Sequence, residues 1–208
     1  SFLAKTAEGE EGSSGHVHLS CWSDGENAFA SDPADGLPTA LAGAVAGVLD
    51  RLPAASLLLN PTINSYKRLV PGYFAPVNAS WGIENRSAAV RVIRSELPAR
   101  CRIECRRPGA DANPYLALAA LVASALDGVR RDAEPPPPVE GDASERSDLP
   151  PLPASLESAL GAFAADEALR GALGEEFSEY YSVSRAWELK AWQQAVTGWE
   201  RERYERAV

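Results

Sequence analysis

The stretch NPTINSYKRLVPGYFAPVNASWGIENRSAAVR, residues 60–91, combines turn-forming residues, aromatic side chains and cations. Its arginines are Arg68, Arg86 and Arg91. The prolines, glycines and asparagines around them favour ordered but irregular backbone. An arginine guanidinium stays charged, and its planar set of donors matches carboxylate or phosphate oxygens two at a time. The stretch therefore predicts a loop that holds anionic ligands.

The segments on either side of this loop are apolar enough to be buried. Residues 57–59 are three leucines, and they predict a buried strand that leads into the loop. Residues 88–93 predict a second strand, in which the valines beside Arg91 face away from its side chain.

Two more segments, residues 16–21 and residues 102–106, alternate between polar and apolar side chains with period two. This alternation is typical of a half-buried strand. Residues 23–27 predict a turn after the first of them, and residues 28–30 a short return strand. The polar faces of the alternating strands carry His16, His18 and Ser20 in one and Arg102, Glu104 and Arg106 in the other. If these strands share a sheet, their apolar faces pack against helices and their polar faces line a site.

Histidine and glutamate on such a face indicate a metal site. A hard divalent ion such as Mg²⁺ or Mn²⁺ prefers oxygen ligands and accepts an imidazole, so His16 and Glu104 are candidate ligands. Two ligands do not hold a metal ion tightly, and the sequence offers no other histidine than His16 and His18. The remaining ligands are expected outside this chain.

The rest of the chain reads mainly as helix. Apolar residues recur at helical spacing on one face within residues 38–52, 113–131 and 183–206. Asn113-Pro114 is a favourable helix start. A proline-rich stretch of small and acidic residues is expected to be a stiff, exposed connector. The helices are predicted over residues 38–52 and 113–131, from near Ser155 and Asp166, and over residues 183–206, with the connector at residues 134–153.

The charge distribution argues against binding to nucleic acid. The 208 residues carry a formal net charge of −9, whereas nucleic-acid affinity depends on neutralising phosphates with Lys and Arg. Residues 60–107 contain nine Lys and Arg against three Glu, a local balance of +6. A cationic segment in an acidic chain fits a focused pocket for a small anion.

Other features bear on location and completeness. We see no apolar run of the roughly 20 residues that a membrane-spanning helix needs and no signal peptide. The three cysteines are odd in number and lack CxxC spacing, which favours free thiols in a reducing cytoplasm. The chain starts at Ser1 and contains no methionine, so we interpret it as a portion of a longer protein.

Three blocks of the sequence, in this order, resemble the glutamine synthetase family. They are GSSGHVHLS at residues 12–20, NPTINSYKRLVPGY followed by APV and ENRSAAVRV at residues 60–92, and RIECRRPGADANPYLALAA at residues 102–120. The resemblance implies an α+β catalytic domain with a curved, mainly antiparallel sheet flanked by helices. Residues 1–208, which begin with SFLAK, would be its C-terminal portion, with the N-terminal domain outside this chain. This portion alone is expected to be inactive, because the remaining carboxylate ligands and part of the nucleotide pocket would lie outside it. The resemblance also implies a homo-oligomer with active sites between subunits.

The resemblance further implies a reaction and a role for each candidate residue. The γ-carboxylate of L-glutamate would attack ATP to give an acyl phosphate, and an amine or ammonia would then displace phosphate. By resemblance, His16 and Glu104 are metal ligands; His18, Ser20, Arg86 and Arg91 contact ATP, the two arginines stabilising the transferring phosphoryl group; and Gly12, Arg68 and Arg106 bind glutamate.

Three residues depart from the family pattern. Phe74 stands where ammonia-using members have a glutamate that binds ammonium, and an aromatic ring can neither bind that ion with an oxygen nor accept its proton. Glu11 replaces an asparagine of the glutamate site, and Glu84 replaces an arginine of the phosphate region. We therefore favour an organic amine as acceptor, with Phe74 as a wall of its pocket. The alternatives are a glutamine synthetase proper and a non-catalytic relative.

Overall fold

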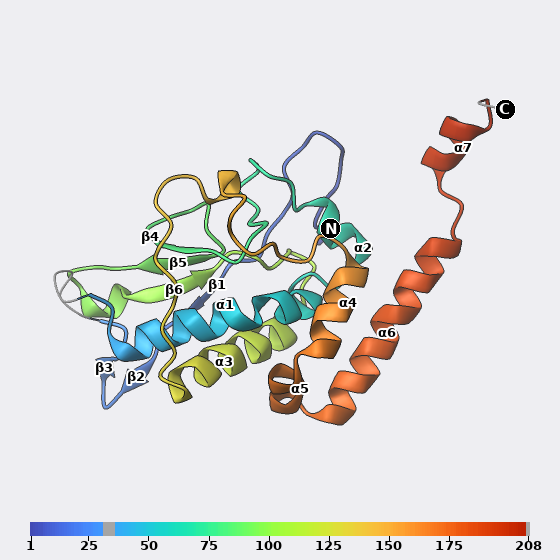
Figure 1. Ribbon diagram of the computed structural model, residues 1–208. Coiled ribbons are helices and arrows are strands. Elements are labelled where there is room, and N and C mark those ends of the chain that lie inside the picture. Colours follow the sequence, from blue (N-terminus) through green and yellow to red (C-terminus); the bar gives the residue numbers. More distant parts are fainter. Residues whose placement is uncertain (31–35, 207–208) are drawn as a thin grey trace.

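The computed structural model describes residues 1–30 and 36–206. Its centre is a four-stranded sheet packed against two long helices, α1 and α3 (Figure 1). The first three strands in the sheet order are antiparallel neighbours, and the last pair is parallel. In spatial order the strands are β1 (Val17–Leu19), β6 (Arg102–Cys105), β5 (Val90–Ile93) and β4 (Trp81–Ile83). The prediction of an α+β fold with a mainly antiparallel sheet is confirmed.

A short hairpin follows β1. Its strands are β2 (Trp22–Ser23) and β3 (Glu26–Asn27), so the return strand begins earlier than the predicted residues 28–30. The turn is tighter than expected because Asp24 and Gly25 both adopt left-handed backbone, with φ of +52° and +83°. Two successive residues of this kind reverse a hairpin within two positions.

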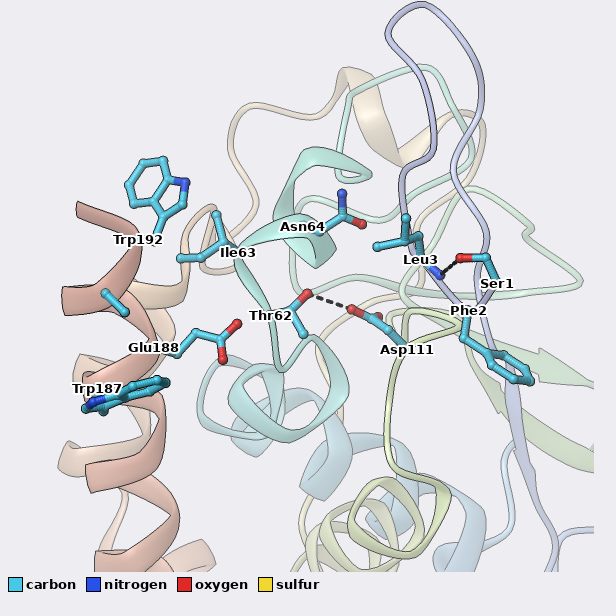
Figure 2. A pocket seen from close by; sticks show the side chains of 11 residues that line it. Ser1, Phe2, Leu3, Thr62, Ile63, Asn64, Asp111, Trp187, Glu188 and Trp192 are labelled. Atoms are coloured by element: carbon cyan, nitrogen blue, oxygen red, sulfur yellow. Dashed lines mark hydrogen bonds between the residues drawn. The ribbon is translucent and has the colours of Figure 1, made fainter. Parts of the chain in front are cut away.

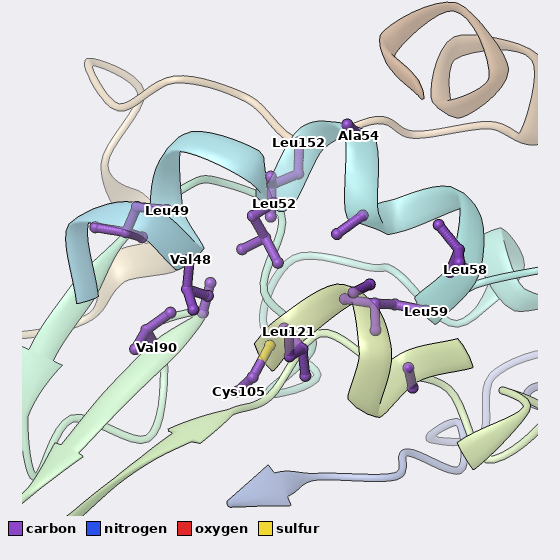
Figure 3. Close-up of a cluster of buried hydrophobic side chains, with 14 of the residues drawn as sticks. Val48, Leu49, Leu52, Ala54, Leu58, Leu59, Val90, Cys105, Leu121 and Leu152 are labelled. Atoms are coloured by element: carbon purple, nitrogen blue, oxygen red, sulfur yellow. The ribbon is translucent and has the colours of Figure 1, made fainter. Parts of the chain in front are cut away.

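One face of the sheet is apolar, as its alternation predicts. Val90, Val92, Ile103 and Cys105 are at most 1% exposed and contribute to the main hydrophobic cluster. Figure 3 shows Val90 and Cys105 facing Val48, Leu121 and other side chains of α1 and α3. The opposite face of the same strands is left for polar side chains.

Helix α1 (Thr39–Leu59) is longer than the sequence predicts. It continues past Pro53 instead of ending at Leu52, and the three leucines of residues 57–59 form its last turn, so the predicted strand there is wrong. These leucines are 0% exposed, and a short apolar run does not distinguish a strand from a helix buried on all sides. By length and composition α1 could cross a membrane. However, 83% of its apolar 18-residue stretch is buried inside the structure, as in a core helix.

Helices α1 and α3 (Pro114–Arg130) touch through their backbones. Asn113 caps α3 by accepting from the backbone N–H groups of its first turn, as predicted. A Cβ built on Gly47 would lie 2.2 Å from the carbonyl oxygen of Ser124, and one built on Gly128 would lie 2.0 Å from that of Gly43. Real Cβ atoms do not approach so closely, so the two helices cross at a contact that only glycine permits.

The proline-rich segment 134–153 is not simply the exposed connector that its composition predicts. Val139 is 5% and Ala143 0% exposed, and they form a small second cluster. The Val139 N–H donates to the Trp81 carbonyl at 2.8 Å, and Trp81 Nε1 donates to the Pro136 carbonyl at 2.6 Å. Because β4 is an edge strand, its free backbone groups need such partners. The segment therefore covers one edge of the sheet.

The C-terminal part is helical, with a break that the sequence pattern did not predict. α4 (Leu156–Ala165) and α5 (Glu167–Leu173) are capped by Ser155 and Asp166, as expected. The single helix predicted over residues 183–206 is instead α6 (Glu175–Gln194) and α7 (Gly198–Tyr204), because Thr197 starts a new capping box. Both helices extend away from the sheet (Figure 1). Within residues 1–30 and 36–206, the remaining helical segments are α2 (Ile63–Lys67) and the 3-10 turns Pro98–Arg100 and Ala143–Glu145.

The three cysteines are free thiols in different environments, which gives a first prediction. Cys21 is exposed, whereas Cys101 and Cys105 are buried. Burial raises the pKa of the Cys105 thiol to about 11, so the reactive thiolate is scarce at lower pH. We expect a disulfide reagent at about pH 8 to label only Cys21 rapidly, and all three thiols of this chain after unfolding in urea. Rapid labelling of more than one thiol in the folded protein would contradict this arrangement.

Candidate functional site

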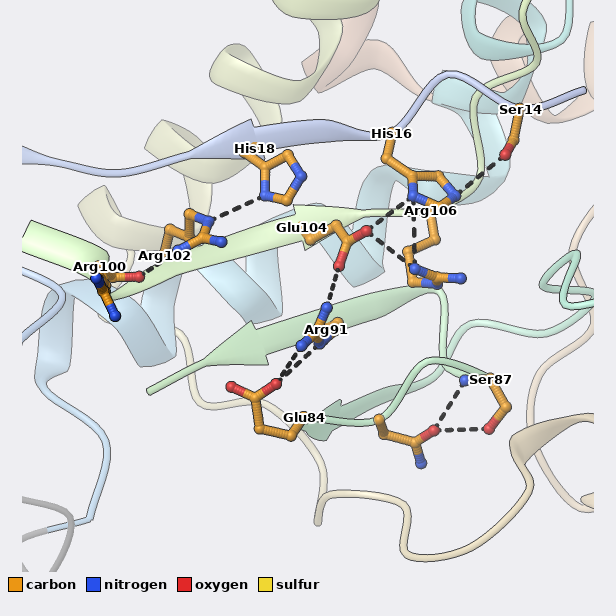
Figure 4. A network of polar contacts seen from close by, with 11 residues as sticks. Ser14, His16, His18, Glu84, Ser87, Arg91, Arg100, Arg102, Glu104 and Arg106 are labelled. Carbon is orange, nitrogen blue, oxygen red and sulfur yellow. Dashed lines mark hydrogen bonds and ion pairs between the residues drawn. The ribbon is translucent and has the colours of Figure 1, made fainter. Parts of the chain in front are cut away.

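The polar face of the sheet brings together residues from three strands. In the pairing register His18 lies opposite Glu104, and Glu104 lies opposite Arg91 on its other side. Arg91 in turn is in register with Gly82 of β4. Figure 4 shows these side chains on one side of the strands, with His16 just before β1 and Arg106 just after β6. The predicted shared polar face is confirmed by this register.

The carboxylate of Glu104 is the centre of the cluster. It is 3% exposed, and its Oε1 lies 2.8 Å from His16 Nδ1 and 2.9 Å from Arg106 Nη1. Its Oε2 accepts from Arg91 Nη1 at 3.1 Å. Burial alone would raise the pKa of this carboxyl, but Arg106, Arg91 and His16 outweigh burial and lower the pKa below its usual value. Glu104 is therefore an ionised, buried carboxylate held by three partners.

His16 is held in its neutral form. Burial, followed by the charge of Arg106, lowers the pKa of the imidazole, against the opposing effect of Glu104. The charge of Arg68 is close enough to lower this pKa further. Ser14 Oγ lies 3.1 Å from Nε2, so both ring nitrogens have a polar neighbour. A neutral imidazole is the form that binds a metal ion.

The metal ligands proposed from the sequence are adjacent but few. His16 and Glu104 are in direct contact through Nδ1 and Oε1. Among residues 1–30 and 36–206 there is no group of three or more His, Cys, Asp or Glu side chains that could hold a metal ion. An imidazole nitrogen and a carboxylate fit Mg²⁺ or Mn²⁺ as a partial ligand set. This chain would contribute two ligands, and the others would come from outside it.

His18 and Ser20 continue the polar face along β1 toward its open end. His18 Nδ1 accepts from Arg102 Nε at 3.1 Å, and Ser20 Oγ accepts from Trp22 Nε1 at 2.9 Å. Both side chains are exposed. Arg102 was not among the candidates, although the alternation of residues 102–106 already put it on the polar face with Glu104.

Arg68 and Gly12 are brought together, as expected for two residues of one binding region. Arg68 is 2% exposed, and its Nη2 donates to the Arg107 carbonyl at 2.6 Å and to Asn60 Oδ1 at 3.3 Å. Burial lowers the pKa of its guanidinium to about 10. A Cβ on Gly12 would lie 2.1 Å from Arg68 Cγ, so glycine is required for this close approach. The Arg68 Nε is buried without a hydrogen-bond partner among the described residues.

Two candidate residues, Arg86 and Phe74, make no hydrogen bond or ion pair with the Glu104 cluster or the Arg68–Gly12 pair in the described structure. Arg86 is exposed and makes no hydrogen bond or ion pair with another residue that the structure describes. Phe74 is 66% exposed on the loop after Arg68, and its backbone is left-handed, with φ of +51°. The structure therefore leaves Arg86 free and directs the Phe74 ring outward.

Sequence reasoning missed two structural supports of the site. The first is Glu84, whose Oε2 accepts from Arg91 Nε at 3.1 Å and also from Arg91 Nη2. The second is Arg107. Arg107 is 1% exposed, and it joins the loop within residues 60–91 to the end of the proline-rich segment by donating to the carbonyls of Pro76, at 2.6 Å, and Pro153. Nothing in the local pattern distinguished Arg107, because alternation assigns it to the apolar face.

A separate cleft of about 700 Å³ lies between the N-terminal segment, α2 and α6 (Figure 2). Phe2, Leu3 and Trp187 contribute apolar walls, and Asp111 accepts from Thr62 Oγ1 at 2.8 Å at its base. None of its lining residues belongs to the Glu104 cluster. The cleft and the polar face are thus different features of the molecule.

Comparison with known proteins agrees with the fold. The family model for the catalytic domain of glutamine synthetase matches residues 1–204. Two solved structures superpose closely, those described as "Apo GmaS without ligand" and "GmaS/ADP complex-Conformation 1". The first has a TM-score of 0.86 and 31% identity over 99% of this chain and 48% of that one; the second has 0.87 and 32% over 99% and 49%. These findings define the class as a catalytic domain of the glutamine synthetase type.

Curated relatives agree on the family. The chain is 40% identical to glutamine synthetase of Thermococcus kodakarensis over 221 residues, which is 98% of this chain and 49% of that protein. It is 41% identical to glutamine synthetase of Thermotoga maritima over 212 residues, or 98% of this chain and 48% of that protein. The chain belongs to the glutamine synthetase family, and it spans about half the length of these relatives.

Proposed function

We propose that the protein is an ATP-dependent carboxylate–amine ligase. It joins the γ-carboxylate of L-glutamate to an amine through a γ-glutamyl phosphate. The observation that carries this proposal is the cluster of His16, Arg91 and Arg106 around the buried carboxylate of Glu104. A polar face on which several arginines converge suits two anionic substrates, and a structural neighbour is described as an ADP complex.

The chain's own residues have distinct tasks in this reaction. Arg106 and Arg68 hold the glutamate, with Gly12 leaving room for the Arg68 stem. Arg91 and Arg86 hold the nucleotide phosphates, while His18 and Ser20 contact the nucleotide beside them. Arginines held at the phosphates offset the charge that develops during phosphoryl transfer.

His16 and Glu104 would hold a Mg²⁺ or Mn²⁺ ion, which neutralises phosphate charge when bound. We further infer that the protein is cytoplasmic, consistent with its three free thiols, and that it forms a homo-oligomer with sites between subunits. The exposed Trp187 and Trp199 of α6 and α7, 69% and 60% accessible, are compatible with such an interface.

An organic amine is the favoured acceptor because of Phe74. Burying an aromatic ring against a carbon chain contributes about 1.5–3 kcal/mol, which an ammonia molecule cannot use. Ammonia itself is the second candidate, since the curated relatives are glutamine synthetases. A non-catalytic relative is the third, and the complete cluster around Glu104 counts against it.

The direct test is phosphate release from ATP by the full-length protein with Mg²⁺ and L-glutamate. Ammonia is compared with a panel of polyamines, ethanolamine and aromatic amines. Strong stimulation by one organic amine supports the ligase with a Phe74-lined pocket, and stimulation by ammonia alone supports glutamine synthesis. No stimulation by any amine would contradict the proposal and leave the non-catalytic alternative.

The second prediction concerns the choice of amine. Phe74→Glu places a carboxylate on the loop, which attracts ammonium and can accept its proton. We expect the ratio of ammonia-dependent to organic-amine-dependent turnover to rise roughly tenfold or more, the equivalent of one lost ring contact. Tyr73→Glu, on the neighbouring and partly exposed ring, is the matched control. An unchanged ratio in Phe74→Glu would exclude the ring from the acceptor pocket.

A further inference from the structure

Glu84 occupies an unusual backbone position beside the polar face. It follows directly after β4, and its φ of +52° lies in the left-handed region that side-chain-bearing residues rarely adopt. Its N–H donates to the Val92 carbonyl at 2.9 Å, which ties this turn to β5. In Figure 4 the Glu84 side chain reaches from the end of β4 toward Arg91. The turn therefore places the Glu84 carboxylate beside Arg91 on the polar face.

Arg91 is bound from two sides by carboxylates. Its Nη1 donates to Glu104 Oε2 at 3.1 Å, and its Nε donates to Glu84 Oε2 at 3.1 Å. Its Nη2 donates to the same oxygen of Glu84. Each of the three guanidinium nitrogens thus has a carboxylate partner, whereas the other candidate phosphate-binding arginine, Arg86, has no partner among the described residues.

The two carboxylates differ in how easily they can be displaced. Glu104 has 4% of its side chain exposed and is also held by His16 and Arg106. Glu84 has 46% of its side chain exposed, and Arg91 is its only ion-pair partner in the part of the chain that the structure describes. An incoming anion would therefore replace Glu84, and not Glu104, on the Nε and Nη2 side of Arg91.

We infer that Glu84 is a positioning residue that competes with the phosphates of the nucleotide for Arg91. This inference rests on the proposed function. A phosphate that binds the Nε and Nη2 side of the guanidinium must either displace the Glu84 carboxylate or lie beside a like charge. Both weaken binding, and the loss grows with the charge of the phosphate chain. Glu84 thereby limits the affinity for ATP and favours release of ADP.

The test compares nucleotide binding by wild-type protein, Glu84→Gln and Glu179→Gln. Calorimetric titration with ADP and Mg²⁺ at low salt is expected to show a Kd roughly tenfold lower for Glu84→Gln. AMP, with one phosphate, is expected to change less. Glu179 is exposed on α6 and takes part in no ion pair among the described residues, so Glu179→Gln removes the same charge away from Arg91, and its Kd should equal that of wild type.

A kinetic readout separates competition from a general structural role. In Glu84→Gln the KM for ATP should fall by a similar factor, while the KM for glutamate stays unchanged. High salt should reduce the difference between variant and wild type, because it screens an exposed carboxylate. Urea unfolding midpoints of the variants report on folding separately.

Two results would overturn the inference. The first is an ADP Kd in Glu84→Gln that equals or exceeds that of wild type, and the second is an equal gain for AMP and ADP. If wild type binds ADP, either result contradicts competition by Glu84 and leaves the proposed nucleotide site standing. If neither wild type nor variant binds ADP, the proposed nucleotide site is wrong and this inference falls with it.

Discussion

Replacing Glu104 by alanine is expected to abolish the proposed ligase activity and to destabilise the protein. The substitution leaves His16, Arg91 and Arg106 facing one another without their shared carboxylate. Removing one partner of a buried ion pair costs about 3–5 kcal/mol, because the remaining charges are desolvated and unpaired. It also removes one of the two metal ligands that this chain would supply. We expect turnover to fall by at least about a thousandfold.

Phosphate release in the presence of glutamate and amine measures the activity, and urea unfolding measures the stability. Glu104→Gln separates the two effects, since it keeps the shape and an acceptor oxygen but removes the charge. Glu179→Ala, at an exposed position on α6, is the control and should change neither quantity appreciably. Turnover of Glu104→Ala within tenfold of wild type would show that the cluster is not the active site.

The same carboxylate gives a pH dependence of stability. Its neighbours lower the pKa of Glu104 in the folded protein, so the folded state binds a proton less readily than the unfolded chain does. The resulting stabilisation is present above the unfolded-state pKa of about 4.3 and is lost as pH falls through the folded-state pKa. Glu104→Gln should therefore flatten the loss of stability that wild type shows below about pH 4.5.

The sequence predicts the polar face well because that face depends on a local rule. Alternation with period two fixes which side chains share a side of a strand, whatever the strand pairs with. Once β1, β5 and β6 pair in register, His18, Glu104 and Arg91 must lie side by side. The resemblance of three sequence blocks added the roles that alternation could not supply.

The errors arise where the outcome depends on contacts distant in sequence. Three leucines at residues 57–59 are equally compatible with a buried strand and a buried helix, and only their surroundings decide. The proline-rich segment looked exposed because its composition does not reveal the open edge of β4 that it covers. The Glu84–Arg91 pair likewise depends on a parallel pairing of β4 and β5 that no local pattern announces.

The crossing of α1 and α3 provides the second large prediction. The pattern of apolar residues did not predict this contact between helix backbones. Gly47→Ala adds one methyl group 2.2 Å from the Ser124 carbonyl oxygen and 2.6 Å from the Gly128 nitrogen. Backbone atoms cannot turn aside as a side chain would, so the helices must separate. We expect a loss of about 3 kcal/mol or more, the upper end of the cost of overpacking a core.

Gly161→Ala is a matched control for this substitution, since it makes the same chemical change in another helix. Gly161 is exposed on α4, and a Cβ there meets nothing within 4 Å. Alanine is the better helix former, so Gly161→Ala should stabilise the protein by about 0.5–1 kcal/mol. Urea unfolding of both variants should thus give shifts of opposite sign. A Gly47→Ala protein as stable as wild type would mean that α1 and α3 do not touch through their backbones.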